Sequence, residues 1–149
     1  MLQKVETAVK EVARPTRVSE GEQIPLYASR PAAGFPAPGD DQVERVLDIN
    51  DLVVRHPAST FFVRVEGDSM EGAGIFSGDV LVIDRAVEPC DGHIVVAAVN
   101  GEMVVKRLYI DNEVLSLHSE NEAYAPILVS QEEDCVVWGV VTGSVRQLL

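Results

Sequence analysis

Lys106 stands where a lysine is unusual. Seven basic residues follow the first 33, and six of them are Arg while this one is Lys. It lies in a run of strand-forming residues, 103–110, and side chains two apart in a strand share a face. The other members of its face are Val104, Leu108 and Ile110, so the amine is alone on an apolar surface. Burial lowers the pKa of an amine, and a neutral amine can act as a general base, although a lysine at a sheet edge can also extend its head to water.

Ser69 lies in a tetrapeptide, Gly67-Asp68-Ser69-Met70, that follows directly after a predicted strand at 61–66. Glycines at 67, 72 and 74 surround it and let the backbone turn sharply and approach a substrate closely. Such a turn can expose a hydroxyl for nucleophilic attack together with the backbone N–H groups of an oxyanion hole. The same residue types also make ordinary turns, so the tetrapeptide alone allows both interpretations.

Regular strands must position these two residues. The sequence from Phe61 onward is rich in Val, Ile and aromatic residues and is punctuated by Gly, Asp and Asn at short intervals. Strands are predicted at 61–66, 80–84, 93–99, 103–110, 114–118, 127–129 and 136–145. Asn100-Gly101, between two of them, predicts a two-residue hairpin turn. Because no helical pattern separates the strands, we expect an antiparallel, mostly β domain.

The first 33 residues differ from the rest of the chain. They hold five basic and four acidic residues, a balance of +1, whereas the other 116 residues carry −13. Apolar residues within 2–12 have rough helical spacing, and repeated prolines then interrupt regular structure. We therefore expect an extended arm over 1–33, with a short helix at its start, followed by a β domain over 34–149. A second short helix is expected within 42–54.

The composition narrows the classes of function. The 149 residues carry 24 acidic and 12 basic side chains, a formal net charge of −12, whereas a phosphate-binding surface needs clustered Lys and Arg. Direct binding of nucleic acid is therefore not expected. Cys90 and Cys135 are far apart and outside any metal-binding spacing, so no disulfide framework, metal or other cofactor is expected. No apolar stretch fits a signal peptide or a membrane span, which predicts a cytoplasmic protein without membrane association.

Four ordered segments resemble one family. Gly67-Asp68-Ser69-Met70, then 77–84 (SGDVLVID), then 101–107 (GEMVVKR), are similar in order and spacing to the Ser/Lys self-cleaving proteins of the bacterial SOS response, the LexA and UmuD group. Upstream, 33–38 (AGFPAP) resembles the cleavage region of the UmuD branch. The resemblance covers residues 33–107 and implies the antiparallel β domain of LexA and the signal peptidases, preceded here by an arm.

The resemblance implies a role for each residue. Ser69 would be the nucleophile and Lys106 its base, with the backbone N–H groups of Ser69 and Met70 stabilising the oxyanion. The bond between Ala33 and Gly34 would be cut, and these small residues suit close approach of the backbone. Gly34 and Ser69 are 35 positions apart, and at about 3.3 Å per residue the arm can reach its own site or that of a partner.

The resemblance also implies partners. A RecA-type filament on single-stranded DNA would stimulate the cleavage. The trimmed protein would be a homodimer that binds a Y-family polymerase subunit of the UmuC type, as an accessory subunit of an error-prone translesion DNA polymerase.

Other functions fit the sequence less well. A Ser-His-Asp triad could use His56, His93 or His118, and Gly-Asp-Ser begins the signature of GDS-type lipases, but their Asp-x-x-His pair is not found in this chain. Signal peptidases share the Ser-Met and Lys motifs but need a membrane anchor. A LexA-like repressor needs a helical DNA-binding domain, which 33 residues interrupted by proline do not supply. A non-catalytic interaction module of the same fold would need neither Ser69 nor Lys106.

Overall fold

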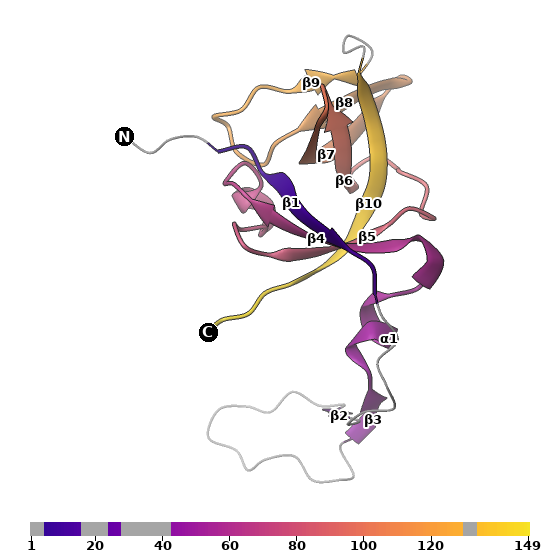
Figure 1. Ribbon diagram of the computed structural model, residues 1–149. Helices are drawn as coiled ribbons and strands as arrows, with labels where there is room; N and C mark the ends of the chain where they lie inside the picture. Colours follow the sequence, from indigo (N-terminus) through magenta and orange to yellow (C-terminus); the bar gives the residue numbers. More distant parts are fainter. Residues whose placement is uncertain (1–4, 16–23, 28–42, 130–133) are drawn as a thin grey trace.

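One antiparallel sheet of eight strands dominates the computed structural model, which describes residues 5–15, 24–27, 43–129 and 134–149 (Figure 1). The order across the sheet is β1-β4-β5-β10-β6-β7-β8-β9. The strands are β1 (Ala8–Ala13), β4 (Thr60–Glu66), β5 (Val80–Asp84), β6 (Ile94–Val99), β7 (Glu102–Asp111), β8 (Val114–His118), β9 (Ile127–Leu128) and β10 (Cys135–Val145). The expectation of a mostly β, antiparallel fold is confirmed.

The strands predicted from the sequence are all found, with each end within one residue of its expected position. The hairpin between β6 and β7 turns at Asn100 and Gly101, whose φ angles are +50° and +81°. Positive φ at both central residues is what a type I′ hairpin turn requires, and Asn-Gly provides it at low cost. This turn fixes the register that sets Lys106 opposite Val95.

The segment near the N-terminus is a strand, so the helix expected there is wrong. β1 pairs with β4 in an antiparallel register that sets Val12 opposite Val63, with an irregularity between Val9 and Glu11. Thr7 is fully buried and Val9 is packed against the core, so alternate residues face inward. An isolated helix this short is marginal, and β-branched valines lower helix propensity further, so pairing with an open strand edge decides the conformation.

Residues 43–53 divide into a strand and a helix. β3 (Val43–Leu47) pairs with β2 (Ile24–Tyr27) as a separate two-stranded sheet, and α1 (Ile49–Val53) follows directly. The Asp48 side chain caps α1 by accepting a hydrogen bond of 2.8 Å from the Asn50 N–H. The short helix expected within 42–54 is therefore found over five residues. Two single-turn 3₁₀ helices, Pro57–Ser59 and Glu71–Ala73, flank β4.

Two hydrophobic clusters hold the large sheet together. The first consists of Val63, Val65, Met70, Ile75, Leu81, Ile83, Val96 and Val105. The second consists of Val95, Ala97, Leu108, Leu117 and Val140. Met70 is fully buried in the first cluster, and this anchors the turn that carries the adjacent Ser69.

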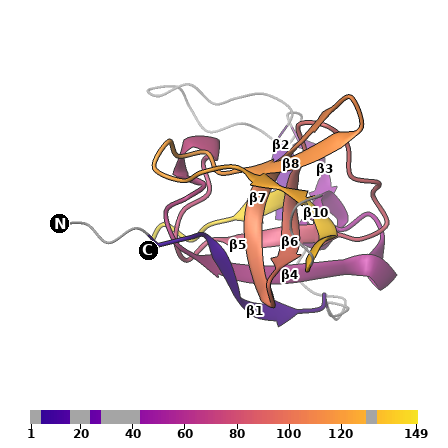
Figure 2. The same ribbon diagram turned by 90° about the horizontal axis from the view of Figure 1, so that it is seen from above.

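β1 closes the sheet by lying between β4 and β7 (Figure 2). β8 pairs with β7 over Arg107–Asp111, which leaves the same edge of β7 available at 102–106. There Ala8 of β1 lies opposite Val104, and the Val105 N–H donates a hydrogen bond of 2.9 Å to the carbonyl of Thr7. A strand near the N-terminus thus occupies a gap that the later strands leave between them.

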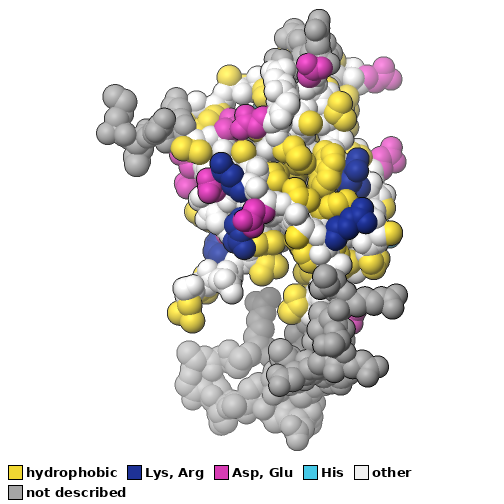
Figure 3. Space-filling view, viewed as in Figure 1, with side chains coloured by type: hydrophobic (Ala, Val, Ile, Leu, Met, Phe, Trp, Pro, Cys, Tyr) yellow, Lys and Arg dark blue, Asp and Glu magenta, His cyan; other side chains and the backbone are white. Residues whose placement is uncertain are grey.

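The surface carries an aromatic and basic cluster. The rings of Phe61 and Trp138 have centroids 5.0 Å apart, and Arg14 and Arg85 lie over them at 4.9 and 4.8 Å. Figure 3, viewed as in Figure 1, shows one side of the molecule, on which hydrophobic side chains gather with basic side chains beside them. Within the described segments, no helix has the length and apolar character needed to cross a bilayer.

Candidate active site

Ser69 lies in a tight turn at the end of β4. Gly67 begins this turn with a φ of +117°, which glycine adopts without strain, and the 3₁₀ helix Glu71–Ala73 ends it. The Ser69 side chain is completely buried, and its hydroxyl oxygen accepts a hydrogen bond of 2.8 Å from the N–H of Thr7. The turn thus points the hydroxyl at the segment that precedes β1 rather than at solvent.

Lys106 is buried near the middle of β7, with 1% of its surface exposed. Its amine forms an ion pair with the Glu6 carboxylate and donates a hydrogen bond of 2.6 Å to the Ser119 hydroxyl. The ring of Tyr124 lies 5.7 Å from the same nitrogen. The alternative in which this lysine extends its head to water is therefore wrong: the amine ends inside the protein among polar partners.

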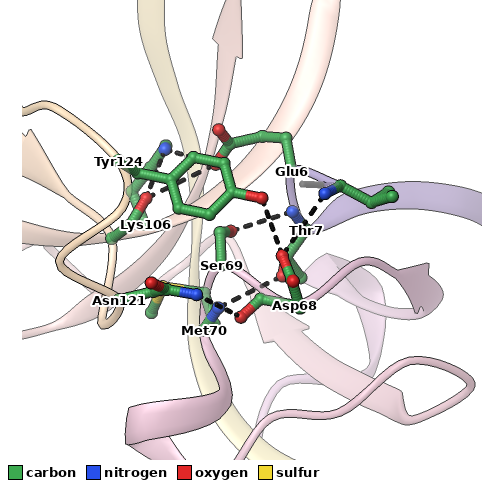
Figure 4. A network of polar contacts seen from close by, with 10 residues as sticks. Glu6, Thr7, Asp68, Ser69, Met70, Lys106, Asn121 and Tyr124 are labelled. Carbon is green, nitrogen blue, oxygen red and sulfur yellow. Dashed lines mark hydrogen bonds and ion pairs between the residues drawn. The ribbon is translucent and has the colours of Figure 1, made fainter. Parts of the chain in front are cut away.

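Ser69 and Lys106 meet around one dipeptide, Glu6-Thr7 (Figure 4). Thr7 contacts the serine turn twice, because its N–H binds the Ser69 hydroxyl and its own hydroxyl accepts a hydrogen bond of 3.3 Å from the Met70 N–H. Glu6 contacts the lysine. The two side chains singled out in the sequence therefore flank consecutive residues, although within the described segments the polar partners of each belong to other residues and not to the other member of the pair.

The loop between β8 and β9 covers the same place. The Tyr124 hydroxyl donates a hydrogen bond of 2.7 Å to the Asp68 carboxylate, and the Asn121 amide donates one of 3.4 Å to the Asp68 carbonyl. Burial, followed by the bond to Asp68 and the negative charge of that carboxylate, raises the pKa of Tyr124 to about 12. The phenol is thus a hydrogen-bond donor throughout the neutral and mildly alkaline range.

Five residues of the site were missed in the sequence: Glu6, Thr7, Ser119, Asn121 and Tyr124. Glu6 and Thr7 belong to a segment for which a helix was expected, and a helix would not have placed them in the sheet. The other three lie in an irregular loop, whose polar residues look like any solvated connection. One feature of the sequence could have pointed to them. Residues 119–121 (SEN) directly follow the predicted strand 114–118, which is the next strand after the one that carries Lys106.

The three histidines lie in other places. His56 contacts the Asp84 carboxylate, His93 accepts a hydrogen bond of 3.1 Å from the Cys90 N–H, and His118 contacts the Ser116 hydroxyl. In the described part of the chain none of these contacts includes Ser69, so a Ser-His-Asp triad is not formed. The predicted cleavage site, Ala33-Gly34, lies outside the described residues.

These features define a class of protein: a closed antiparallel β domain in which a serine turn and a buried lysine face one extended segment of chain. The chain belongs to the Peptidase S24-like family, whose model matches residues 25–142. It is 42% identical over 123 residues to protein SamA of Salmonella typhimurium, covering 83% of this chain and 85% of SamA. It is also 42% identical over 124 residues to protein ImpA of Escherichia coli, covering 79% and 80%.

A LexA repressor is similar at lower identity and over a smaller share of its own length. The chain is 36% identical over 137 residues to the LexA repressor of Shewanella sediminis, covering 89% of this chain but 66% of the repressor. SamA and ImpA are SOS mutagenesis proteins of the UmuD type, and they match at higher identity over most of their own length. The chain is therefore a UmuD-like member of the family, and the repressor function is disfavoured.

Proposed function

We propose that the protein cuts its own chain between Ala33 and Gly34, with Ser69 as nucleophile and Lys106 as base. The observation that carries this proposal is the burial of both side chains on either side of an extended peptide segment, Glu6-Thr7, which they contact directly. A groove that already holds one peptide backbone against Ser69 can hold another.

The chemistry needs a neutral lysine. Lys106 Nζ accepts the proton of the Ser69 hydroxyl as Oγ attacks the carbonyl carbon of Ala33, and the N–H groups of Ser69 and Met70 bind the oxygen that becomes negative. The carbon–nitrogen bond to Gly34 then breaks, and the Lys106 ammonium returns its proton to the leaving amine. Water, deprotonated by the same lysine, hydrolyses the resulting ester and restores Ser69.

The groove suits a small and flexible cleavage site. A Cβ atom placed on Gly67 would lie 2.3 Å from the carbonyl oxygen of Glu6, which now lies in the groove. The backbone of any peptide bound there therefore passes directly over this glycine. Ala33 and Gly34 bring little side-chain volume to such a contact. This agreement between groove and sequence supports the assignment of the bond.

The cellular role follows the UmuD-like relatives. After the arm is removed, the 34–149 product acts in SOS mutagenesis as an accessory subunit of an error-prone polymerase, with a UmuC-type Y-family subunit as its partner. A RecA-type filament in the cytoplasm stimulates the cut. Homodimer formation is supported by Ile49 and Leu52 of α1, which are 56% and 54% exposed although large and apolar.

A comparison of variants tests this function. Wild-type protein, Ser69→Ala and Lys106→Ala are incubated with a recombinase filament on single-stranded DNA and ATP, and the 34–149 product is followed on a gel. Ser144→Ala is the matched control, because Ser144 is exposed in β10. Product should form in the wild type and the control and be absent from both site variants. If either site variant formed product at the wild-type rate, the proposed roles of Ser69 as nucleophile and Lys106 as base would be wrong.

A further inference from the structure

The groove between β4 and β7 has room for one extended strand, and β1 fills it. β1 pairs with β4 along Ala8–Ala13 and contacts β7 at Ala8. The segment just before it lies over the serine turn, where the Asp68 N–H donates a hydrogen bond of 2.8 Å to the Val5 carbonyl. A Cβ on Gly67 would come within 2.6 Å of both the Glu6 carbonyl carbon and the Thr7 nitrogen. A second strand that presents a bond to Ser69 needs the same space.

Glu6 and Thr7 contact the proposed nucleophile, the proposed base and one of the two proposed oxyanion donors. The nucleophile is held by Thr7, whose N–H donates to the Ser69 hydroxyl oxygen at 2.8 Å. The oxyanion donor is held as well, because the Met70 N–H donates to the Thr7 hydroxyl. The base is held by Glu6, whose carboxylate pairs with the Lys106 ammonium. An ammonium in an ion pair has no lone pair with which to accept the serine proton.

This occupation does not present a bond for cleavage. Attack requires the hydroxyl oxygen to face a carbonyl carbon whose oxygen points at the N–H donors. Ser69 faces an amide nitrogen instead, and the Met70 N–H faces a side-chain hydroxyl. The Thr7 carbonyl oxygen points the other way, to the Val105 N–H on β7. The segment therefore lies in the groove as a substrate would, but it places no carbonyl carbon opposite the Ser69 hydroxyl.

We propose that residues 5–13 are an inhibitory strand of this protein: they fill the substrate groove, and Glu6 and Thr7 block the base, the nucleophile and the oxyanion donor until the strand leaves. The inference rests on the proposed self-cleavage and adds the step that must precede it. The groove takes one strand at a time, so the Ala33-Gly34 segment of the same or another copy enters only after β1 has left. A stimulating partner then acts by binding the form in which β1 is displaced.

A reversible lock on β1 tests the proposal. Glu11 and Arg64 are register partners on β1 and β4, and their side chains form an exposed ion pair at 3.6 Å, so they point the same way. Opposite residues on paired strands have Cβ atoms about 4.5–5.5 Å apart, which allows a disulfide after a small adjustment. We expect Glu11→Cys with Arg64→Cys, in a Cys90→Ser and Cys135→Ala background, to form that disulfide.

The oxidised protein should cleave itself at least about tenfold more slowly than the same protein after reduction, because the lock prevents the strand from leaving. The two single-cysteine variants, treated with the same oxidant, are the controls and should be unaffected. Equal rates before and after reduction would overturn the inhibitory role while leaving the self-cleavage intact. Failure of the disulfide to form in the folded protein would contradict the β1–β4 register on which the role depends.

Substitutions in the inhibitory strand should act in the opposite direction. Glu6→Gln removes the charge that holds the lysine, and Thr7→Val removes the hydroxyl that holds the Met70 N–H. Each should speed spontaneous cleavage, and Glu6→Gln by about tenfold, since a hydrogen bond between charged groups is the stronger kind. Glu88→Gln makes the same change of charge at an exposed position between β5 and β6, away from the strand and the site, and should have no effect. A slower or unchanged rate in Glu6→Gln would contradict the proposal.

A second readout does not depend on cleavage. In Ser69→Cys, in the background Cys90→Ser and Cys135→Ala, the thiol should react slowly with iodoacetamide because the strand covers it. Adding Glu6→Gln and Thr7→Val should increase the alkylation rate at least severalfold, and adding Glu88→Gln should not. Equal alkylation rates in all three proteins would contradict the inhibitory role of the strand, whether or not the protein cleaves itself. If the alkylation rates differ as expected but the wild-type protein does not cleave itself, only the proposed self-cleavage would be wrong.

Discussion

The N–H of Thr7 donates a hydrogen bond of 2.8 Å to the hydroxyl of Ser69, a residue 62 positions further along the chain. The bond is buried, so neither group has water as an alternative partner. A buried serine hydroxyl held by a backbone N–H is kept in one orientation. The resting position of the Ser69 hydroxyl is therefore set by the N-terminal segment, which is the part of the chain that the proposed self-cleavage would remove.

Loss of the base and loss of the nucleophile should have the same consequence. Ser69→Ala, Lys106→Met and the double variant should all lose self-cleavage to the same background level, because residues that act as a unit are not additive. Lys106→Arg should be equally inactive, since a guanidinium stays protonated and cannot accept the serine proton. The measurement is the rate of appearance of the 34–149 product. Activity retained in Lys106→Arg would exclude this lysine as the base.

The cleavage rate should rise with pH. The Lys106 amine accepts the serine proton only in its neutral form, so less acidic conditions should favour the reaction. Rates between neutral pH and about pH 10 measure this, with circular dichroism at each pH to show that the fold is kept. A rate that falls above neutral pH in the folded protein would indicate a different mechanism.

The Tyr124 phenol should stay protonated through that range, because its pKa is raised to about 12 by burial and by Asp68. A raised pKa stabilises the folded state below the unfolded value of about 10, and this contribution is lost as pH rises toward the folded value. Absorbance of phenolate during an alkaline titration measures it. Tyr124→Phe should remove the phenol that ionises near pH 12 from this titration.

The sequence was sufficient to predict the seven strands from β4 to β10, and it singled out Ser69 and Lys106, because these features show in local patterns. Alternating apolar residues and turn residues predicted β7, and a single lysine on an apolar face marked Lys106 within it. The Gly67-Asp68-Ser69-Met70 turn was visible for the same reason. These features depend on neighbours along the chain, which a sequence displays directly.

The partners of those side chains could not be predicted in this way. Glu6 meets Lys106 across 100 positions, and Tyr124 meets Asp68 across 56. Such contacts depend on which strand edges remain open after the rest of the sheet has formed. The helix expected near the N-terminus failed for this reason: the weak spacing of its valines counted for less than the free edges of β4 and β7.

The C-terminal end of β10 should be held by a buried carboxylate. Asp79 is 1% exposed and accepts hydrogen bonds of 2.6 and 2.7 Å from Arg146 and one of 2.9 Å from the Phe76 N–H. Asp79→Asn should lower the free energy of unfolding by about 2 kcal/mol, because the charged hydrogen bonds are lost in a buried place. Urea denaturation measures this, and Asp111→Asn, at an exposed position, is the matched control with little expected change.

The same contact should weaken in acid. The hydrogen bonds from Arg146 hold the pKa of Asp79 below its usual value. A lowered pKa stabilises the fold above the unfolded value of about 3.9, and the contribution disappears as pH falls through the folded value. The difference in unfolding free energy between wild type and Asp79→Asn should therefore shrink below about pH 4. A difference that stays constant down to pH 2 would show that this carboxylate does not titrate with folding.

The mass of the fragments formed at alkaline pH tests the central claim most directly. Purified full-length protein is incubated with and without a recombinase filament, and the products are weighed by mass spectrometry beside Ser69→Ala. Cleavage by Ser69 at the proposed bond predicts two fragments from the wild type, one ending at Ala33 and one beginning at Gly34, and intact Ser69→Ala. A cut at another bond, such as Gly39-Asp40, the same fragments from Ser69→Ala, or an intact wild type under both conditions would contradict it.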